Sequence, residues 1–271
     1  MIRFLILAGY FELTMYLQLS GKLNQYINLH YSYLAYISMF LSFVLALVQL
    51  IIWVKQMKIH SHLSSFWAKV ASIFLLCIPL FVGLFFPTVT LDSQTVSAKG
   101  YHFPVAAGSS KEIQQDEGTT TQYLKPDTSS YFTKSAYESE MKQAAKKYVD
   151  KKVIQVTTEN YMEVMEVFYD YPDQFAGKTI ELTGFVYNDP NNKDSQFLFR
   201  FGIIHCIADS GVYGLLTTGA PQHFENNTWI HAKGTLSIEY HKQLKQSLPV
   251  LHISDCQTIT KPDNPYVYRV F

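Results

Sequence analysis

Hydrophobic residues are concentrated in the first third of the chain, where they form three long runs. The runs are Phe4–Leu19, Tyr33–Val54 and Phe66–Phe86. A helix needs about 20 apolar residues to cross a bilayer, and the second and third runs reach that length. The pattern predicts a membrane domain over residues 1–87. Its spans are expected at about residues 4–20, 33–54 and 66–86.

The first run shares a basic start, at Arg3, with secretory signal peptides. However, Glu12 interrupts the run, and no small-x-small cleavage site follows before Gly21. Two further runs come after it. We therefore expect a retained transmembrane helix.

Positive charges in the short loops predict the orientation of the helices. Arg3, Lys55 and Lys69 flank one side of the predicted membrane domain, whereas the loop between the first two runs carries only Lys22. Cationic residues favour the cytoplasmic side. The sequence thus predicts a multi-pass protein of the cell membrane, with a cytoplasmic N-terminus and an extracellular domain after Pro87.

The composition becomes polar after the third run. Residues 88–133 are rich in Gly, Ser, Thr and charged residues, which is typical of a linker that buries no core. Residues 134–175 are expected to be helical, because Ser135 and Glu138 form a capping-box pattern and Pro172 ends a second amphipathic stretch.

Apolar and polar residues alternate from about residue 177 onward, as in β-strands. Five strands are expected, in KTIELTGFVYND, QFLFRFGIIHCIADS, VYGLLTTGA, WIHAKGTLSIEYH and LPVLHISDCQTIT. Gly184, Gly202 and Gly234 interrupt strands, and such glycines mark bulges or tight bends. The predicted fold class is therefore α+β, with transmembrane helices, further helices and a small OB-like all-β barrel domain at residues 176–271. A five-stranded sandwich would give the same pattern.

The net charge gives no indication of a nucleic-acid partner, and the sequence contains none of three common catalytic motifs. The 271 residues have a formal net charge of +0, so we expect no nucleic-acid partner. No GxSxG, HExxH or P-loop motif occurs, and we expect no enzyme activity. Glu163 and Glu166 are interpreted as solvated charges on the outer face of a helix. Whether Cys206 and Cys256 form a disulfide depends on whether their strands are adjacent.

The sequence His205-Cys206-x-x-Asp209 combines an imidazole, a thiol and a carboxylate, a ligand set suited to zinc or copper. Because a strand sends neighbouring side chains to opposite faces, a bulge or a turn at Asp209 would be needed to bring them together. Missing ligands could come from other strands, at His231, His252 and Cys256. The alternative is a buried cysteine beside an edge histidine, with Asp209 in a simple turn.

Two further features lie in or beside the predicted membrane domain. Glu12 is costly within a bilayer, by about 2.5–3.5 kcal/mol at the centre of a helix. Glu12 is either an ion or proton relay or a polar contact with a partner helix. Alternatively, it lies near the outer end of a shallow span or is protonated. His60 and His62 could bind a metal weakly, or belong to a solvated loop.

The whole chain resembles the YcgQ-type membrane proteins of Gram-positive bacteria. The matching segments are SGKLNQYINLHYSYLAY, FFPTVTLDSQTVSAKG, FAGKTIELTGFVYNDP, FLFRFGIIHCIADSGVYGLL and KPDNPYVY. Members are regarded as subunits of a two-component permease, and the resemblance implies a multi-spanning permease partner in the lipid bilayer. Some members have a His-rich loop after the second span, which implies metal handling at the position of His60 and His62.

Three hypotheses follow. The first is an accessory or regulatory subunit of a membrane permease for a metal ion or small solute. The second is a membrane-anchored extracellular binding module, in which the helices only hold the β-domain at the membrane. The third is a metal-binding envelope protein built on His205, Cys206 and Asp209, with zinc as the candidate cofactor.

Overall fold

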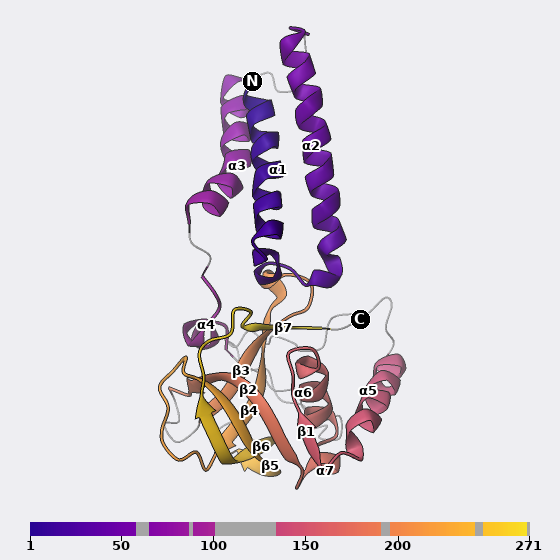
Figure 1. Ribbon diagram of the computed structural model, residues 1–271, viewed down its shortest axis with the longest axis vertical. Helices are drawn as coiled ribbons and strands as arrows, with labels where there is room; N and C mark the ends of the chain where they lie inside the picture. The colour runs from indigo at the N-terminus through magenta and orange to yellow at the C-terminus, as the bar shows by residue number, and fades with distance from the viewer. Residues whose placement is uncertain (58–64, 87–88, 101–133, 191–195, 242–245, 270–271) are drawn as a thin grey trace. The chain divides into compact units, whose positions relative to one another are not determined.

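A computed structural model of the chain contains two compact units, Met1–Thr90 and Leu91–Phe271 (Figure 1). The structure describes residues 1–57, 65–86, 89–100, 134–190, 196–241 and 246–269. Each unit is described by itself below.

The N-terminal unit consists of three long helices. They are α1 (Ile2–Leu19), α2 (Ser32–Val54) and α3 (Phe66–Phe85), with the 3₁₀ turns η1 (Lys22–Gln25) and η2 (Leu29–Tyr31) between the first two. All three helices, with η2 extending the second, are long and apolar enough to cross a membrane. The three predicted spans are thereby confirmed as helices of the expected length and composition.

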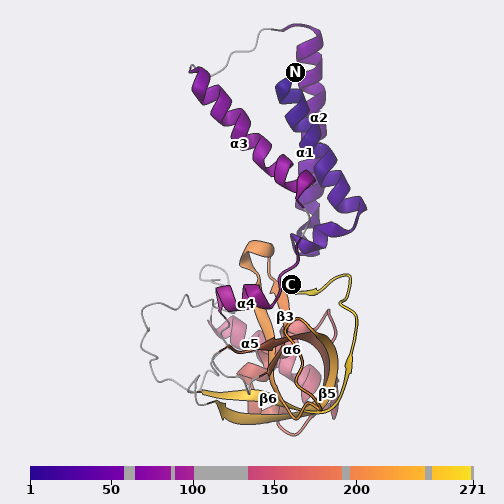
Figure 2. The ribbon, with the colours of Figure 1, turned by 90° about the vertical axis from the view of Figure 1, so that its left-hand side faces the viewer.

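Small residues bring α1 and α3 into close contact. A Cβ added at Gly9 would lie 3.0 Å from Leu80, and one added at Gly83 would lie 2.9 Å from Leu13. Close approach at glycine is a common way for helices to pack in a membrane. In Figure 2 these helices converge toward the end of α3, whereas its beginning stands apart from α1 and α2.

A proline inside α3 is supported by α1. Pro79 lacks the N–H that would continue the helical hydrogen-bond ladder, and its ring disturbs the preceding turn. The hydroxyl of Tyr10 donates a hydrogen bond of 2.9 Å to the carbonyl of Leu76 in that turn. The carbonyl that Pro79 deprives of its helical N–H partner is that of Leu75, so the hydrogen bond from Tyr10 supports the adjacent carbonyl of the disturbed turn.

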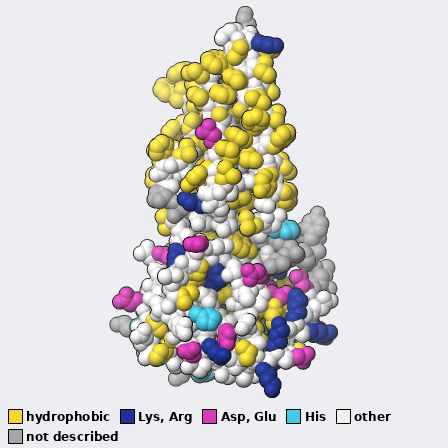
Figure 3. Space-filling view, in the orientation of Figure 1, with side chains coloured by type: hydrophobic (Ala, Val, Ile, Leu, Met, Phe, Trp, Pro, Cys, Tyr) yellow, Lys and Arg dark blue, Asp and Glu magenta, His cyan; other side chains and the backbone are white. Residues whose placement is uncertain are grey.

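The helices bury few side chains within their own unit. In α1 and α2 the buried residues are Ile6 and Ala46, and α3 has none. Figure 3 shows hydrophobic side chains over much of the visible surface of these helices. A surface of this kind requires lipid or another protein around it.

Among its described residues, the C-terminal unit has seven strands, four α-helices and one short 3₁₀ helix. The helices are α4 (Ser93–Lys99), α5 (Lys134–Val149), α6 (Tyr161–Asp170) and α7 (Pro172–Phe175). The strands are β1 (Val153–Gln155), β2 (Thr179–Asn188), β3 (Gln196–Ile203), β4 (Gly211–Thr218), β5 (Trp229–His241), β6 (Gln246–Thr258) and β7 (Tyr266–Tyr268). The chain is therefore α+β, as predicted.

Strands β2 to β6 pair in a closed ring. The sheet order is β1-β2-β5-β6-β4-β3-β7, and β2 also pairs with β3. Within the ring β4 and β6 run parallel, and the other pairs are antiparallel. These five strands are the five that the alternating pattern predicted. The short strands β1 and β7, each of three residues, were not predicted because three residues are too few to show an alternation.

The three strand glycines allow close approaches between neighbouring segments. A register shift between Lys233 and Gly234 marks the expected bulge in β5. A Cβ at Gly184 would lie 2.7 Å from the carbonyl oxygen of Phe199 on β3. One at Gly202 would lie 2.5 Å from the Tyr213 ring.

Helix α4 belongs to the C-terminal unit, although the sequence placed its residues in the predicted linker. The Asp92 carboxylate caps the helix by accepting hydrogen bonds from the N–H groups of Gln94 and Thr95. Val96 is fully buried, and the N–H of Ser93 donates to Asn227. One buried residue per helical turn is too weak a signal to distinguish a short packed helix from a polar tether. Residues 101–133 of the predicted linker lie outside the described residues.

Candidate functional site

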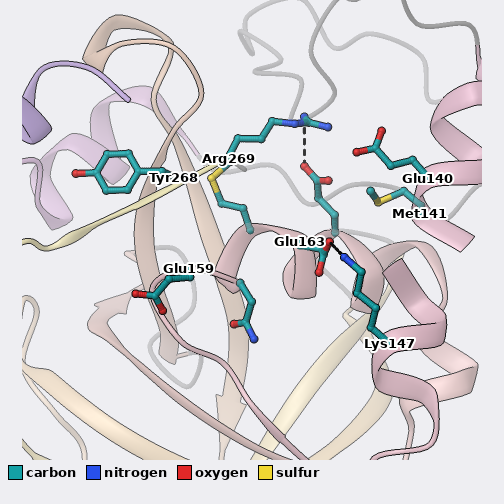
Figure 4. A pocket seen from close by; sticks show the side chains of 10 residues that line it. Glu140, Met141, Lys147, Glu159, Glu163, Tyr268 and Arg269 are labelled. Atoms are coloured by element: carbon teal, nitrogen blue, oxygen red, sulfur yellow. Dashed lines mark hydrogen bonds and ion pairs between the residues drawn. The ribbon is translucent and has the colours of Figure 1, made fainter. Parts of the chain in front are cut away.

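A cavity of about 220 Å³ lies beside α5, α6 and the end of β7 (Figure 4). It is lined by Glu140, Met141, Lys147, Glu159, Asn160, Met162, Glu163, Glu166, Tyr268 and Arg269. Four of these ten residues are glutamates, and two are cations. Charged side chains of both signs therefore converge on this cavity.

Hydrogen bonds to Glu163 fasten α5 to α6 on one side of the cavity. Lys147 Nζ lies 2.7 Å from one carboxylate oxygen of Glu163, and the Tyr148 hydroxyl donates to the other over 2.6 Å. At the opposite end of α5, the Tyr137 hydroxyl donates to Asp170 over 3.0 Å. These contacts explain how a helix with a thin apolar face packs in a fixed position.

Glu166 lines the same cavity but differs from the other charged residues there in being buried. It is 6% exposed, and its nearest cation is Arg269, whose Nη1 lies 3.6 Å from Oε1. Burial raises the pKa of Glu166 to about 7; the Arg269 charge opposes this rise, and Asp170, Glu140 and Glu163 add to it. A carboxyl group of this kind exchanges its proton near neutral pH.

The interpretation of Glu163 and Glu166 as two solvated charges was wrong for Glu166. The sequence shows an acidic residue three positions after another on an amphipathic helix, which normally marks the outer face. Because α5 and the segment after β7 cover this face, Glu166 is buried. Arg269 lies far from Glu166 in the sequence, so no pattern around Glu166 indicates the contact between the two side chains.

Replacing Glu166 with Gln is expected to flatten the dependence of stability on pH. The ionised carboxylate is disfavoured in the folded state, so the wild-type protein loses stability as pH rises from about 4.5 to about 7 and then levels off. The total loss is at most about 3 kcal/mol. Melting temperatures at pH 5 and pH 8 measure the effect, with Asp173→Asn, an exposed carboxylate in α7, as the control. An equally steep pH dependence in Glu166→Gln would contradict the assignment.

The residues His205, Cys206 and Asp209 form a local turn. The Asp209 carboxylate accepts hydrogen bonds from the backbone N–H groups of His205 and Cys206, and its Oδ2 lies 2.7 Å from His205 Nδ1. Cys206 in turn caps the 3₁₀ turn η3 (Ile207–Asp209). The turn at Asp209 agrees with the structural alternative, whereas Cys206 is half-buried and not buried as that alternative expected. Within the described ranges no three His, Cys, Asp or Glu side chains are placed to hold a metal ion, and the metal role stays a prediction.

The other candidate ligands lie apart in the sheet. His231 Nδ1 is 3.0 Å from the hydroxyl of Thr183, and His252 Nε2 is 2.6 Å from Glu239. Cys206 and Cys256 are free thiols, so the possible disulfide is not formed. His60 and His62 lie outside the described residues.

Glu12 is the remaining predicted site residue. It lies in the middle of α1, about 15 Å along the axis from the first helical residue, and its side chain is exposed. It is also the only acidic residue among the first 90. The structure thus places Glu12 away from both ends of α1, and its role in a relay or a partner contact stays a prediction.

Two family models match the chain. They are the DUF1980 N-terminal domain over residues 2–102 and the DUF1980 C-terminal domain over residues 131–269. The chain belongs to the DUF1980 family. The predicted YcgQ-type resemblance is confirmed, because the chain is 39% identical to the "UPF0703 protein YcgQ" of Bacillus subtilis strain 168, over the full length of both.

A second relative is more similar still. The chain is 67% identical, over the full length of both, to a Streptococcus mutans protein that is named "Putative two-component membrane permease complex subunit". No solved structure matches the chain significantly.

The closing segment KPDNPYVY, which carried part of the family resemblance, has a clear structural role in this DUF1980 protein. It places β7 beside β3, where Phe201 pairs with Tyr266. It also delivers Tyr268 and Arg269 to the cavity that contains Glu166. The segment therefore completes the candidate site from the far end of the chain.

Proposed function

We propose that this chain is an accessory or regulatory subunit of a two-component membrane permease. Helices α1, α2 and α3 pack against a multi-spanning partner in the cell membrane. Three spans are too few for an obvious pore in one copy. The name of the Streptococcus mutans relative and the full-length similarity to it support this assignment.

The position of Glu12 is the observation that carries the proposal. A carboxylate in mid-span is costly unless a hydrogen-bond donor or a cation meets it. Glu12 is exposed on the same side of α1 as Leu5, seven residues before it, and Met15 and Leu19, three and seven residues after it. A polar or cationic side chain of the partner would satisfy Glu12 on this face, while the apolar neighbours pack around the contact.

The C-terminal unit would act outside the cytoplasm. The excess of cations at Arg3, Lys55 and Lys69 supports a cytoplasmic N-terminus, which leaves the residues after the third span on the outer side. Five strands in a ring with one parallel pair suit a small Greek-key barrel of the OB type. On this proposal the barrel recognises a metal ion or small solute, and the cavity at Glu166 senses the local pH.

Co-purification tests the assignment. The full chain is expressed in its native host, extracted from membranes in mild detergent, and its companions are identified by mass spectrometry. Glu12→Leu is expected to reduce recovery of the partner by about 10-fold or more, because a charge-assisted hydrogen bond contributes roughly 1.5–3 kcal/mol. Glu12→Gln, which keeps hydrogen-bonding capacity, is expected to retain part of the recovery.

Leu5→Ala on the same exposed face is the control for a general packing effect. Recovery of the wild-type chain alone as a monodisperse monomer would contradict the proposal. Full function after exchange of residues 1–87 for an unrelated anchor would instead support a membrane-anchored binding module.

A further inference from the structure

The N-terminal unit contains a large cleft at the end where α2 stops and α3 begins. Its volume is about 910 Å³, and all three helices contribute to its walls. The cleft exists because α1 and α3 touch near Gly9 and Gly83 but diverge toward the beginning of α3 (Figure 2). It opens within the part of the chain that is apolar enough to lie in a membrane.

The cleft combines apolar walls with a cationic rim. Its depth is lined by aliphatic side chains such as Ile6, Leu7, Ile52 and Ile73. Arg3 of α1 and Lys69 of α3 lie on the rim, and both side chains are exposed.

Three uncharged polar side chains, of Gln49, Gln56 and Ser72, also line the cleft. No carboxylate balances the two cations at the cleft. Glu12 is the only acidic residue among residues 1–90, and it does not line the cleft. A ligand for this space must therefore bring its own negative charge together with a substantial apolar surface.

We propose that this cleft binds one anionic phospholipid. The phosphate group lies between Arg3 and Lys69 and accepts hydrogen bonds from the neighbouring polar side chains, and the acyl chains occupy the space between the helices. Inorganic phosphate would leave the apolar walls uncovered. Basic pockets between membrane helices are a known class of site for anionic headgroups. This proposal does not depend on the identity of a permease partner.

Trp53 provides a probe inside the cleft, because its ring is one of the lining groups. The chain has three tryptophans. Trp67 is exposed on α3, and Trp229 is buried in the C-terminal unit. In a Trp67→Phe background, brominated lipid in contact with the helices will quench Trp53, while Trp229 supplies a constant background.

The full-length chain in this background is reconstituted into vesicles of phosphatidylcholine that contain a small fraction of brominated phosphatidylglycerol or of brominated phosphatidylcholine. Brominated phosphatidylglycerol is expected to quench Trp53 at a several-fold lower mole fraction than brominated phosphatidylcholine does. Arg3→Gln and Lys69→Gln are each expected to raise the mole fraction of brominated phosphatidylglycerol that quenches Trp53 by roughly fivefold. A change of this size corresponds to the binding contribution of one Lys or Arg at an anionic lipid surface. High salt is expected to reduce the preference.

Lys55→Gln is the matched control, since Lys55 lies at the same end of the unit but does not line the cleft. It should leave the preference for phosphatidylglycerol unchanged. Unaltered melting of each variant in detergent shows that the helices remain folded.

Three results would overturn the proposal. The first is equal quenching by the two brominated lipids. The second is a preference that all three charge variants reduce equally, which would reflect general surface attraction. The third combines two observations: the isolated chain shows no preference between the lipids, and co-expression with a partner shields Trp53 from quenching. This result would mean that a partner helix fills the cleft.

Discussion

Arg200→Met is expected to destabilise the C-terminal unit by about 4 kcal/mol. Arg200 is 3% exposed, and its guanidinium donates to the carbonyl oxygens of Asn264, Pro265 and Tyr266. It also donates to the hydroxyl of Thr158 over 2.9 Å. Methionine fills the space but leaves four acceptors without these donors. Thermal and denaturant unfolding of the full chain, followed by far-UV circular dichroism, measure the loss.

Two further variants separate the role of Arg200 from that of charge alone. Arg200→Lys keeps the positive charge but cannot reproduce the planar fork of donors, so an intermediate loss is expected. Lys233→Met removes a partly exposed ion pair with Glu181, 2.7 Å long, and should lower the stability far less than Arg200→Met. Equal stability of Arg200→Met and the wild type would show that the closing segment is held by packing instead.

The loss of Arg200 has a functional consequence as well as a structural one. Arg200 holds the segment that leads into β7, and β7 delivers Tyr268 and Arg269 to the cavity at Glu166. Releasing this segment would remove Arg269 from Glu166. The same segment covers Glu166, and burial is the largest cause of its raised pKa, so the pKa of that carboxyl should fall toward its ordinary value when the segment is released.

Gly214→Ala is expected to prevent the pairing of β3 with β4. A Cβ at this position would lie 2.0 Å from the carbonyl oxygen of Leu198, which is backbone and cannot rotate away. Gly214 is also paired with Phe199, whose ring atom Cδ1 would lie 2.7 Å from the new Cβ. Because backbone must move in the middle of the ring, the expected result is loss of cooperative unfolding or a destabilisation of more than about 3 kcal/mol.

The control for Gly214 is Gly177→Ala. Gly177 has φ of +82° and no atom within 4 Å of a new Cβ, so this substitution tests backbone strain without a clash. It should cost only about 1–2 kcal/mol. A Gly214→Ala protein as stable as Gly177→Ala would mean that the two strands separate more easily than their spacing indicates. Differential scanning calorimetry of the full chain compares both variants directly.

The sequence by itself determined the division of the chain and most of its elements. Continuous apolar runs identify α1, α2 and α3, because only a sequence without regular polar positions can face a bilayer on all sides. Alternation identifies β2 to β6, because successive side chains of a strand point to opposite faces. Glu12 was recognisable as a site residue, since an acid in an apolar run stands out without knowledge of its neighbours.

Only the tertiary structure decided how distant segments meet. Closure of the ring, the capture of the closing segment by Arg200 and the burial of Glu166 beside Arg269 all join residues far apart in the chain. The same holds for the cleft that brings Arg3 and Lys69 to one rim. His205, Cys206 and Asp209 show the reverse case, because a promising ligand set is used locally as a turn. A local pattern reports which side of an element is apolar, whereas contacts between elements depend on packing that no short segment specifies.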